Sequence, residues 1–409
     1  METLQPKLRF PEFKDNWNKI KLGEFTQWAS GGTPPKDNVN YWNGDIPWIS
    51  ASSMRGLEYT NSELKISLEG LKKGSKLAKK GDLLLLVRGS MLFNKIPIGI
   101  AGIDVSFNQD LKSISVDNQV SNSKYILQWF FHSEPKLLNM VTGTGIGAGK
   151  LDLSDLKDLK INLPSLNEQT RIANFLSSVD EKLNLLKEKK ALLEEYKKGI
   201  MQKIFNQEIR FKDDNGEDFG EWEKVVLSEV FDYKKGNGLS KDKLDVNGIY
   251  SCVLYGELYT KYNEVIFEVK SKTNSNEGLL SEIGDLLIPS STTTSGIDLA
   301  NVTALNFDNV LLGGDITVLR SNQELSSVFY AYYLSNHKKE EIASYAQGIT
   351  IVHLYYSHIK DMIIDLPSNE EQTKIANFLS AIDEKIALVS NQIQDTQEYK
   401  KGLLQQMFV

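Results

Sequence analysis

Residues 163–182 read LPSLNEQTRIANFLSSVDEK, and residues 366–385 read LPSNEEQTKIANFLSAIDEK, in a chain of 409 residues. Each copy is followed by a second similar pair, EYKKGIMQKIF at 195–205 and EYKKGLLQQMF at 398–408. An internal repeat constrains the architecture of the whole chain before any local pattern is considered. Two near-identical segments that each follow a dissimilar stretch predict two different domains on one shared frame.

Both repeats have the apolar spacing of a long helix. In the first copy a seven-residue series runs through Ile172, Val179, Leu186, Leu193 and Ile200. This heptad spacing predicts coiled-coil helices that begin soon after the Leu-Pro pair, each about 37 residues long. We expect the two helices to pair with each other in antiparallel orientation; the alternative is that each packs separately on its own domain.

A further echo precedes each dissimilar stretch. Leu8-Arg9-Phe10, followed by Trp17, matches Ile209-Arg210-Phe211, followed by Trp222. The N-terminus therefore resumes the pattern at the point where the C-terminus stops, like a circle that has been cut once. This arrangement predicts that the two ends of the chain lie near each other.

The dissimilar stretches have the pattern of mixed α+β domains. Short apolar runs bounded by Gly, Asn and Pro predict strands, and Gly81-Asp82 and Gly284-Asp285 predict equivalent turns into buried strands. One helix is expected in each stretch. The strands are expected at 45–50, 82–87, 96–100, 112–116, 285–288 and 315–319, and the helices at 123–140 and 326–345. The predicted divisions are a first domain at 1–160, a first repeat helix at 161–211, a second domain at 212–365 and a second repeat helix at 366–409.

Charge divides unevenly between the two domains. The whole chain has a formal net charge of -7. Counting Lys and Arg against Asp and Glu gives +4 for residues 1–160 and -11 for residues 212–365. An acidic second domain argues against nucleic-acid binding, unless a local basic face or a partner supplies the phosphate contacts. The single cysteine, Cys252, excludes an internal disulfide, and no signal peptide or membrane span is found in the sequence, so we expect a cytoplasmic protein without membrane contact.

The sequence contains no convincing catalytic pattern. The four histidines, at 132, 337, 353 and 358, fit no usual metal spacing, and we expect them to be structural. The glycine-rich stretch Thr142–Lys150 fails the phosphate-loop pattern at Thr144 and Leu151, so we interpret it as a flexible connection. No amino-methyltransferase tetrad or convincing nuclease cluster is found. The interpretation is a binding protein with no metal and no cofactor of its own.

Polar and basic side chains gather in the loops of both dissimilar stretches. Arg and Lys side chains bind guanine edges, Asn and Gln bind adenine, and Ser and Thr bind either bases or phosphates. We therefore interpret these loops as candidate DNA contacts. The candidates are Thr33, Lys36, Arg55, Arg88, Ser90, Asn94 and Lys95 in the first stretch, and Lys234, Lys235, Asn237, Lys241, Ser291, Thr292 and Thr293 in the second.

The order of domain, repeat, domain, repeat resembles the specificity subunit of type I restriction–modification systems over essentially the whole chain. The matching repeat residues are Leu163-Pro164, Glu168-Gln169, Ile172-Ala173 and Leu176, with Leu366-Pro367, Glu371-Gln372, Ile375-Ala376 and Leu379 in the second copy. The first domain adds Ser30–Pro34, Tyr41–Ile49 and Asn108–Asp110. The second domain departs from this pattern and has Gly313-Gly314-Asp315 in place of Asn108–Asp110.

The resemblance implies a non-catalytic protein whose two target recognition domains each read one half of a split, asymmetric site in double-stranded DNA. It implies that the helices set the gap between the halves and dock two methyltransferase subunits, to which nuclease subunits are added. S-adenosylmethionine, ATP and Mg²⁺ are then expected on those partners only. As docking residues it points to Glu168, Gln169, Ile172, Glu371, Gln372 and Ile375.

Two other readings remain open. The first is a two-domain coiled-coil scaffold or adaptor that holds other proteins and does not read DNA, a reading that the acidic second domain favours. The second is a fused restriction enzyme, which the missing methyltransferase and nuclease patterns disfavour.

Overall fold

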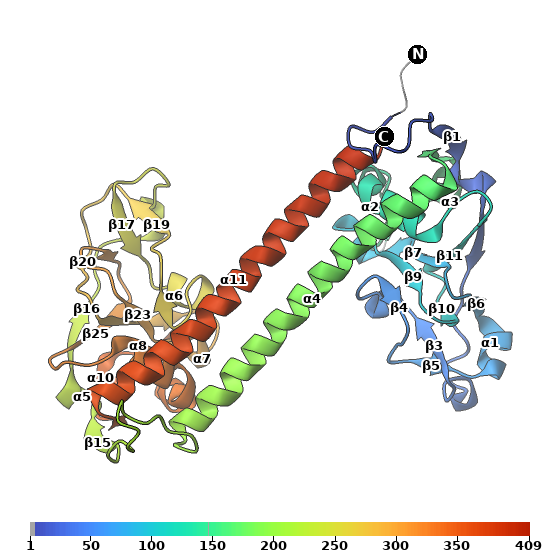
Figure 1. Cartoon of the computed structure of the whole chain (residues 1–409). Helices are drawn as coiled ribbons and strands as arrows, with labels where there is room; N and C mark the ends of the chain where they lie inside the picture. The colour runs from blue at the N-terminus through green and yellow to red at the C-terminus, as the bar shows by residue number, and fades with distance from the viewer. Residues whose placement is uncertain (1–4, 146) are drawn as a thin grey trace. The chain divides into compact units, whose positions relative to one another are not determined.

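The computed structural model describes residues 5–145 and 147–409. The chain forms two compact units (Figure 1), and each contains one α+β domain and parts of both repeats. Unit 1 comprises Met1–Glu188 and Ser390–Val409, and unit 2 comprises Lys189–Val389. The helical repeats are therefore shared between the units and do not form a separate body.

The domain of unit 1 is built on two sheets. The larger has five strands in the order β2-β11-β7-β9-β4, and the smaller has four in the order β5-β3-β10-β6. All four residues of β7 are buried, as expected for a central strand. The bounds are β2 Thr26–Ser30, β3 Ile46–Ile49, β4 Glu58–Tyr59, β5 Lys65–Ile66, β6 Lys76–Ala78, β7 Leu83–Leu86, β9 Ile98–Ala101, β10 Val105–Phe107 and β11 Leu111–Val116, with helices α1 Leu68–Gly74, α2 Ser123–Asn139 and α3 Leu153–Asp158.

The domain of unit 2 repeats this plan with different residues. Its five-stranded sheet has the order β16-β25-β21-β23-β18, and its four-stranded sheet has the order β19-β17-β24-β20. The strand bounds are β16 Phe231–Lys235, β17 Tyr250–Val253, β18 Val265–Ile266, β19 Ser271–Thr273, β20 Leu279–Leu280, β21 Asp285–Pro289, β23 Thr303–Leu305, β24 Leu311–Leu312 and β25 Ile316–Ser321. Its short helices are α5 Leu227–Val230, α6 Glu257–Thr260, α7 Gly296–Leu299 and α10 Tyr356–Ile359.

The expected strands and turns are confirmed. Gly81 and Gly284 precede the buried strands β7 and β21 with φ of 95° and 92°, a left-handed conformation that glycine adopts without a Cβ penalty. The first expected domain helix is α2. The second, expected as one helix at 326–345, is broken: α8 Ser327–Tyr332 passes into a π-helical turn, Tyr333–His337, before α9 Lys339–Ser344.

The repeats form helices α4, Leu166–Phe205, and α11, Asn369–Met407. A short antiparallel strand pair leads into each of them, β1 Asn18–Lys21 with β14 Lys160–Leu163 and β15 Glu223–Val226 with β27 Ile363–Leu366. The apolar seam of each helix is buried against the α+β domain beside it, through Ile172, Leu176 and Val179 in unit 1 and through Ile375, Leu379 and Ile382 in unit 2.

Within each unit the start of one repeat helix contacts the end of the other. In unit 1, Lys400 of α11 lies 2.6 Å from Asp180 of α4, and Lys400 also lies over the ring of Phe131. In unit 2, Lys197 of α4 lies 2.8 Å from Asp383 of α11. The expected antiparallel pairing of the helices is thus confirmed inside both units.

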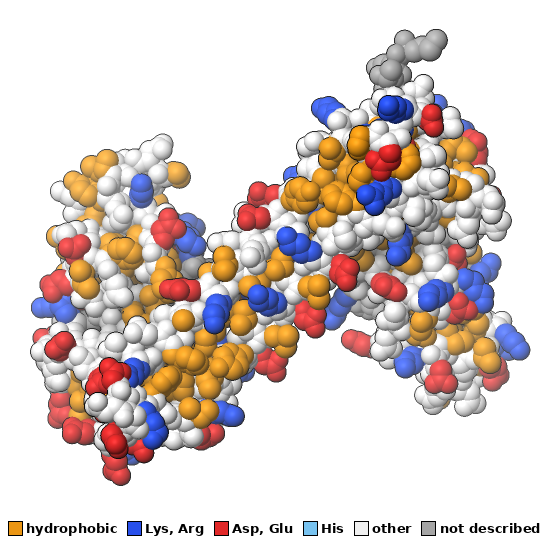
Figure 2. Space-filling model, viewed as in Figure 1, with side chains coloured by type: hydrophobic (Ala, Val, Ile, Leu, Met, Phe, Trp, Pro, Cys, Tyr) orange, Lys and Arg blue, Asp and Glu red, His pale blue; other side chains and the backbone are white. Residues whose placement is uncertain are grey.

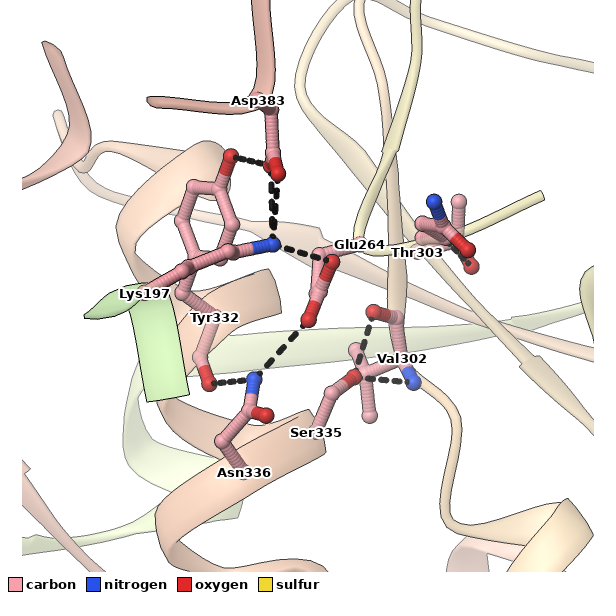
Figure 3. Close-up of polar contacts among 9 residues, drawn as sticks. Lys197, Glu264, Val302, Thr303, Tyr332, Ser335, Asn336 and Asp383 are labelled. Atoms are coloured by element: carbon pink, nitrogen blue, oxygen red, sulfur yellow. Dashed lines mark hydrogen bonds and ion pairs between the residues drawn. The ribbon is translucent and has the colours of Figure 1, made fainter. Parts of the chain in front are cut away.

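Lys197 carries a second carboxylate contact, whereas Asp180 is the one carboxylate partner of Lys400 among the residues that the structure describes. Figure 3 shows the Lys197 ammonium group between Asp383 and Glu264, 3.1 Å from the latter. Asn336 also donates to Glu264, and Tyr332 donates to Asp383. Burial alone would raise the pKa of Glu264, but the charge of Lys197 and the bond from Asn336 outweigh burial and lower that pKa. Helix α4 is therefore tied to the domain of unit 2 by an ionised network.

The predicted circular arrangement of the chain is confirmed at both junctions, where the end of a repeat helix meets the segment that precedes a domain. The backbone of Leu8 donates to the carbonyl of Gln406 at 2.9 Å, so the N-terminal segment lies beside the end of α11. The equivalent bond in unit 2 runs from Ile209 to Lys203, at the end of α4, over 3.3 Å. The aromatic residues at the two helix ends also match. The ring of Phe408 stacks on that of His132 with 5.3 Å between their centroids, and the rings of Phe205 and His337 have centroids 6.2 Å apart.

Candidate nucleic-acid interface

One edge of the five-stranded sheet in unit 1 collects nearly all the loops that the sequence singled out. Strands β2, β11, β7 and β9 are antiparallel neighbours. The end of β2, the start of β11, the end of β7 and the start of β9 therefore lie at the same edge. We call this the loop edge of unit 1; its loops are 31–36, 108–110 and 87–97.

Unit 2 has an equivalent loop edge, formed by residues 236–241, 313–315 and 290–295. Gly313 and Asn108 occupy the same place, because each donates a backbone bond to the end of a strand in the smaller sheet, Val253 and Ile49 respectively, at 3.0 Å. Asp315 then corresponds to Asp110, as the sequence comparison of these segments predicts.

Most of the predicted DNA contacts in unit 1 are brought together at its loop edge. Thr33 donates to Gln109 across the first two loops at 2.7 Å. Arg88 lies on the short strand β8, Arg88–Gly89, directly after β7. The remaining candidates at this edge, Lys36, Ser90, Asn94 and Lys95, are exposed.

Arg55 comes from a different loop that runs from β3 to β4. This loop begins beside Asn108, which donates to Ile49, and ends where Leu57 accepts a bond from Ile100 of β9. Arg55 is exposed. The loop therefore borders the same edge, but it belongs to the connection between the two sheets.

The predicted contacts in unit 2 fall into two groups. Lys234, Lys235, Asn237, Lys241 and Thr293 are exposed on β16 and its neighbouring loops. Ser291 and Thr292 are only 5% and 3% exposed, and their hydroxyl groups are engaged, by Asp315 at 2.9 Å and by Thr294 at 2.8 Å. These two residues shape the loop and do not present free polar groups to a ligand.

Sequence reasoning missed a small sheet that completes each loop edge. In unit 1 the glycine-rich stretch returns as β12, Thr142–Gly143, and β13, Gly149–Lys150, and β13 pairs with β8 so that Lys150 lies opposite Arg88. The prediction of a merely flexible connection was therefore wrong for 142–143 and 149–150, which are paired strands; Ile146 lies outside the described residues. In unit 2, β22 Ser291–Thr292 pairs with β26 Val352–His353. The sequence signal that could have predicted these strands is their position, because both stretches directly follow the helical region of their domain.

Two ionisable groups close to the loop edge of unit 1, Lys112 and Asp152, have pKa values below their ordinary ones. Burial lowers the pKa of Lys112, whose ammonium group donates to Ser30 at 2.6 Å. The hydrogen bonds from Ser154, followed by that from Lys150, lower the pKa of Asp152. Figure 2 shows basic and acidic side chains interspersed on the face in view, without a continuous basic stripe.

The residues predicted to dock partner subunits are buried. Glu168, Gln169, Ile172, Glu371, Gln372 and Ile375 are all no more than 2% exposed. Arg9 makes two bonds to Glu168 at 2.7 and 2.8 Å, and Arg210 makes two to Glu371 at 3.1 and 2.7 Å. The hydrogen bond to Glu168 raises the pKa of Arg9.

The repeated glutamine secures the helical region of each domain. Gln169 accepts bonds from Ser121 and from the backbone of Asn122, the residue that caps α2. Gln372 accepts a bond from the backbone of Ser326, the cap of α8. The Glu-Gln pair of each repeat therefore joins frame to domain, and neither residue of the pair is exposed.

Two of the four histidines are structural, as expected. Burial lowers the pKa of both His132 and His337, and each packs against the aromatic end of a repeat helix. Among the described residues, no group of three His, Cys, Asp or Glu side chains is placed to hold a metal ion. In the same part of the chain, no helix combines the length and apolar character needed to cross a membrane.

Comparison with known proteins identifies relatives over the whole chain. A family model described as the type I restriction modification DNA specificity domain matches residues 14–195 and again 220–397. The type I restriction enzyme MjaVIII specificity subunit of Methanocaldococcus jannaschii is 24% identical over 415 residues, covering 97% of this chain and 92% of that protein. The EcoR124I/EcoR124II specificity subunit of Escherichia coli is 32% identical over 183 residues, covering 44% of this chain and 45% of that protein.

The fold is shared with a solved structure. The type I restriction-modification S subunit from M. genitalium matches with a TM-score of 0.64 and 17% sequence identity, and the match covers 99% of both chains.

Proposed function

Because the chain belongs to the family of type I restriction–modification DNA specificity subunits, we propose that its two domains read the two halves of a split, asymmetric site in double-stranded DNA. The chain itself is non-catalytic and supplies the specificity, the role that the names of its relatives give. It acts in the cytoplasm by bringing two methyltransferase subunits, and through them nuclease subunits, to that site. S-adenosylmethionine, ATP and Mg²⁺ belong to those partners.

The observation that carries this proposal is the pair of loop edges. Both are built on the same strand order, yet they carry different side chains. A shared scaffold with unlike loops suits the reading of two unlike sequences, because a rigid sheet positions loops whose residues are free to vary.

The side chains at each loop edge have the chemistry for base readout. In unit 1, Arg88 suits the O6 and N7 acceptors of guanine, while Asn94 and Gln109 suit the N6 and N7 groups of adenine. In unit 2, Asn237, Lys235 and Lys241 serve the same purpose. Since the two sets differ, the two half-sites are expected to differ in sequence.

The docking surface for the methyltransferase subunits is proposed on the exposed side of the repeat helices. Nine positions of α4 are exposed and carry the same residue, also exposed, in α11 203 positions later, although exposure places no packing demand on them. We call them the repeat surface: Thr170, Asn174, Glu181, Lys182, Leu185, Glu195, Tyr196, Lys198 and Gln202, with Thr373, Asn377, Glu384, Lys385, Leu388, Glu398, Tyr399, Lys401 and Gln405. Each unit presents one copy of the repeated Leu and Tyr, so two similar subunits have two similar places to bind.

The experiment that tests the function is a map of methylated adenines in cells that express the cognate methyltransferase subunit, with and without this chain. A split motif that depends on the chain is expected. Arg88→Ala should relax one half of that motif at a cost of about 1–3 kcal/mol in discrimination and leave the other half intact. A stable complex with the methyltransferase subunit but no motif, and no salt-dependent affinity for duplex DNA, would favour the adaptor reading.

The repeat surface yields a separate prediction. Tyr196 and Tyr399 are 52% and 55% exposed, and a tyrosine anchor in an interface is worth about 2 kcal/mol, or about 30-fold in affinity. Tyr196→Ala and Tyr399→Ala should each weaken one of two binding events for the methyltransferase subunit, measured by calorimetry. Leu192→Ala is the matched control, because Leu192 is 59% exposed on α4 but has Asp395 as its counterpart. Equal effects of all three substitutions would contradict the repeat surface.

A further inference from the structure

The hydrogen-bond register shows that His353 of unit 2 occupies the place of Lys150 in unit 1. Lys150 pairs with Arg88, and the next residue, Leu151, donates to Val87 at 2.9 Å. His353 pairs with Ser291, and the next residue, Leu354, donates to Ser290 at 3.0 Å. Two equivalent strand pairs, each followed by an equivalent backbone bond, fix this correspondence without reference to sequence similarity.

The surroundings of the two side chains correspond as well. Lys150 bonds to Asp152, two residues later, at 3.3 Å. His353 bonds through Nδ1 to the hydroxyl of Tyr355, also two residues later, at 3.1 Å and stacks on its ring at 5.5 Å. Unit 2 therefore keeps a nitrogen base at this position of the loop edge, hydrogen-bonded to the residue two positions later, but has an imidazole where unit 1 has a lysine ammonium group.

Several ionisable groups lie on the elements that pack against the strand of His353. Ser291, opposite His353, donates to Asp315. Helix α7, which packs against β26, contributes Asp298, whose pKa is lowered by bonds from Thr294 and Ser295 and by the charge of Lys339. The segment that follows β26 adds Tyr355 and His358, and the one that precedes it adds Tyr345. The elements that pack against β26 therefore contribute two carboxylates, Asp315 and Asp298.

The hydrogen bonds of the two nearby histidines differ in whether they would survive protonation of the ring. His358 accepts a backbone bond from Tyr355 through Nδ1 at 3.4 Å, and protonation at that nitrogen would break the bond. The partner of His353 is a tyrosine hydroxyl, which can either donate or accept. His353 can therefore gain a proton and keep its contact. No partner for its Nε2 is found within the described part of the chain, so that atom is available to a ligand.

We propose that His353 is a phosphate-binding residue of the second recognition domain, taking the place of Lys150, and that it takes up a proton when DNA binds. This inference rests on the proposed function. An adjacent phosphate stabilises the protonated imidazole, so the DNA-bound form holds more protons than the free form. The affinity for the second half-site is then highest at low pH and declines as pH rises through neutrality, while the affinity for the first half-site does not.

The test uses the full-length chain in complex with its methyltransferase subunits. Affinity is measured between pH 6 and pH 8.5 at fixed ionic strength for duplexes with the full site, or with either half scrambled. The wild-type complex should lose affinity with rising pH, by up to about tenfold per pH unit, which is the limit for one proton taken up on binding. The salt slope should shrink by about 0.9 over the same range, as for the loss of one phosphate contact. Scrambling the second half should abolish this pH dependence.

Three variants separate the contribution of His353 to DNA binding from that of Lys150. His353→Lys should bind tightly at every pH, and His353→Gln, which can keep a bond to Tyr355, should bind weakly at every pH. Lys150→Gln should weaken binding throughout and retain the pH dependence. An unchanged pH profile in His353→Gln would overturn the inference while leaving sequence-specific binding intact, whereas the absence of any specific duplex binding would overturn the proposed function itself.

Discussion

At the scale of single residues, the residues that recur in both repeats are of two kinds, buried and exposed. Glu168 and Glu371 are repeated because each closes a buried bond network with an arginine, and Tyr196 and Tyr399 are repeated although solvent surrounds them. A sequence shows that a residue recurs but does not show its burial. For that reason Glu168 and Gln169 were predicted as docking residues, while the exposed repeated positions were overlooked.

The buried pairs lead to a stability prediction. Glu168→Ala leaves Arg9, whose side chain is 11% exposed, without its carboxylate, and breaking a buried ion pair in this way costs about 3–5 kcal/mol. Hydrogen-exchange protection should fall in the domain of unit 1 and persist in unit 2. Glu371→Ala should have the mirror effect, through Arg210 and Trp222. Glu181→Ala, at an exposed position of α4, is the control, and a loss below about 1 kcal/mol in Glu168→Ala would contradict this assignment.

At the scale of elements, the sequence was sufficient for the long helices and most strands. Heptad spacing and buried runs such as Leu83–Leu86 depend on local pattern, which survives without knowledge of tertiary contacts. The loop edges could not be predicted in full, because the pairing of β13 with β8 joins residues about 60 positions apart in the chain and glycine-rich segments carry little register information. The π-helical turn at Tyr333–His337 was missed for a similar reason, since its sequence reads as a continuous helix.

The helices yield a prediction about the gap between half-sites. Removing residues 186–192 from α4 and 389–395 from α11 deletes one heptad at equivalent positions, which preserves the apolar seam and both the Asp180–Lys400 and Asp383–Lys197 pairs. Each helix shortens by ~10 Å at 1.5 Å per residue, equivalent to roughly 3 base pairs. The methylated motif should keep both halves and change its spacer. An unaltered spacer would contradict a role of the helices as a ruler.

At the scale of the whole molecule, the junctions at the two helix ends are equivalent. The bond between Leu8 and Gln406 matches the bond between Ile209 and Lys203, so the chain can be opened at one junction and closed at the other. The acidic composition of residues 212–365 does not alter this symmetry of plan. It does alter the chemistry available at the second loop edge, where a histidine stands in for a lysine.

This symmetry predicts that a circular permutant folds. A chain that begins at Gln207, joins Val409 to Met1 through a short glycine–serine linker and ends at Asn206 retains the contacts of both units. Its unfolding midpoint and its methylated motif should match those of the natural order. A permutant opened within β7, whose residues are all buried, is the control and should not fold. Loss of the motif in the first permutant, with its fold intact, would contradict the equivalence of the junctions.

The composition of unit 1 has a consequence for the order of events during synthesis. Unit 2 is a single continuous stretch, Lys189–Val389, whereas unit 1 needs Ser390–Val409 to supply Leu403, Met407 and Phe408 to its core. Domains fold as their residues leave the ribosome. Unit 2 therefore has all of its residues once Val389 has been made, at a time when unit 1 is still incomplete. The domain that is translated first waits, with an open apolar face, until Ser390–Val409 have been made.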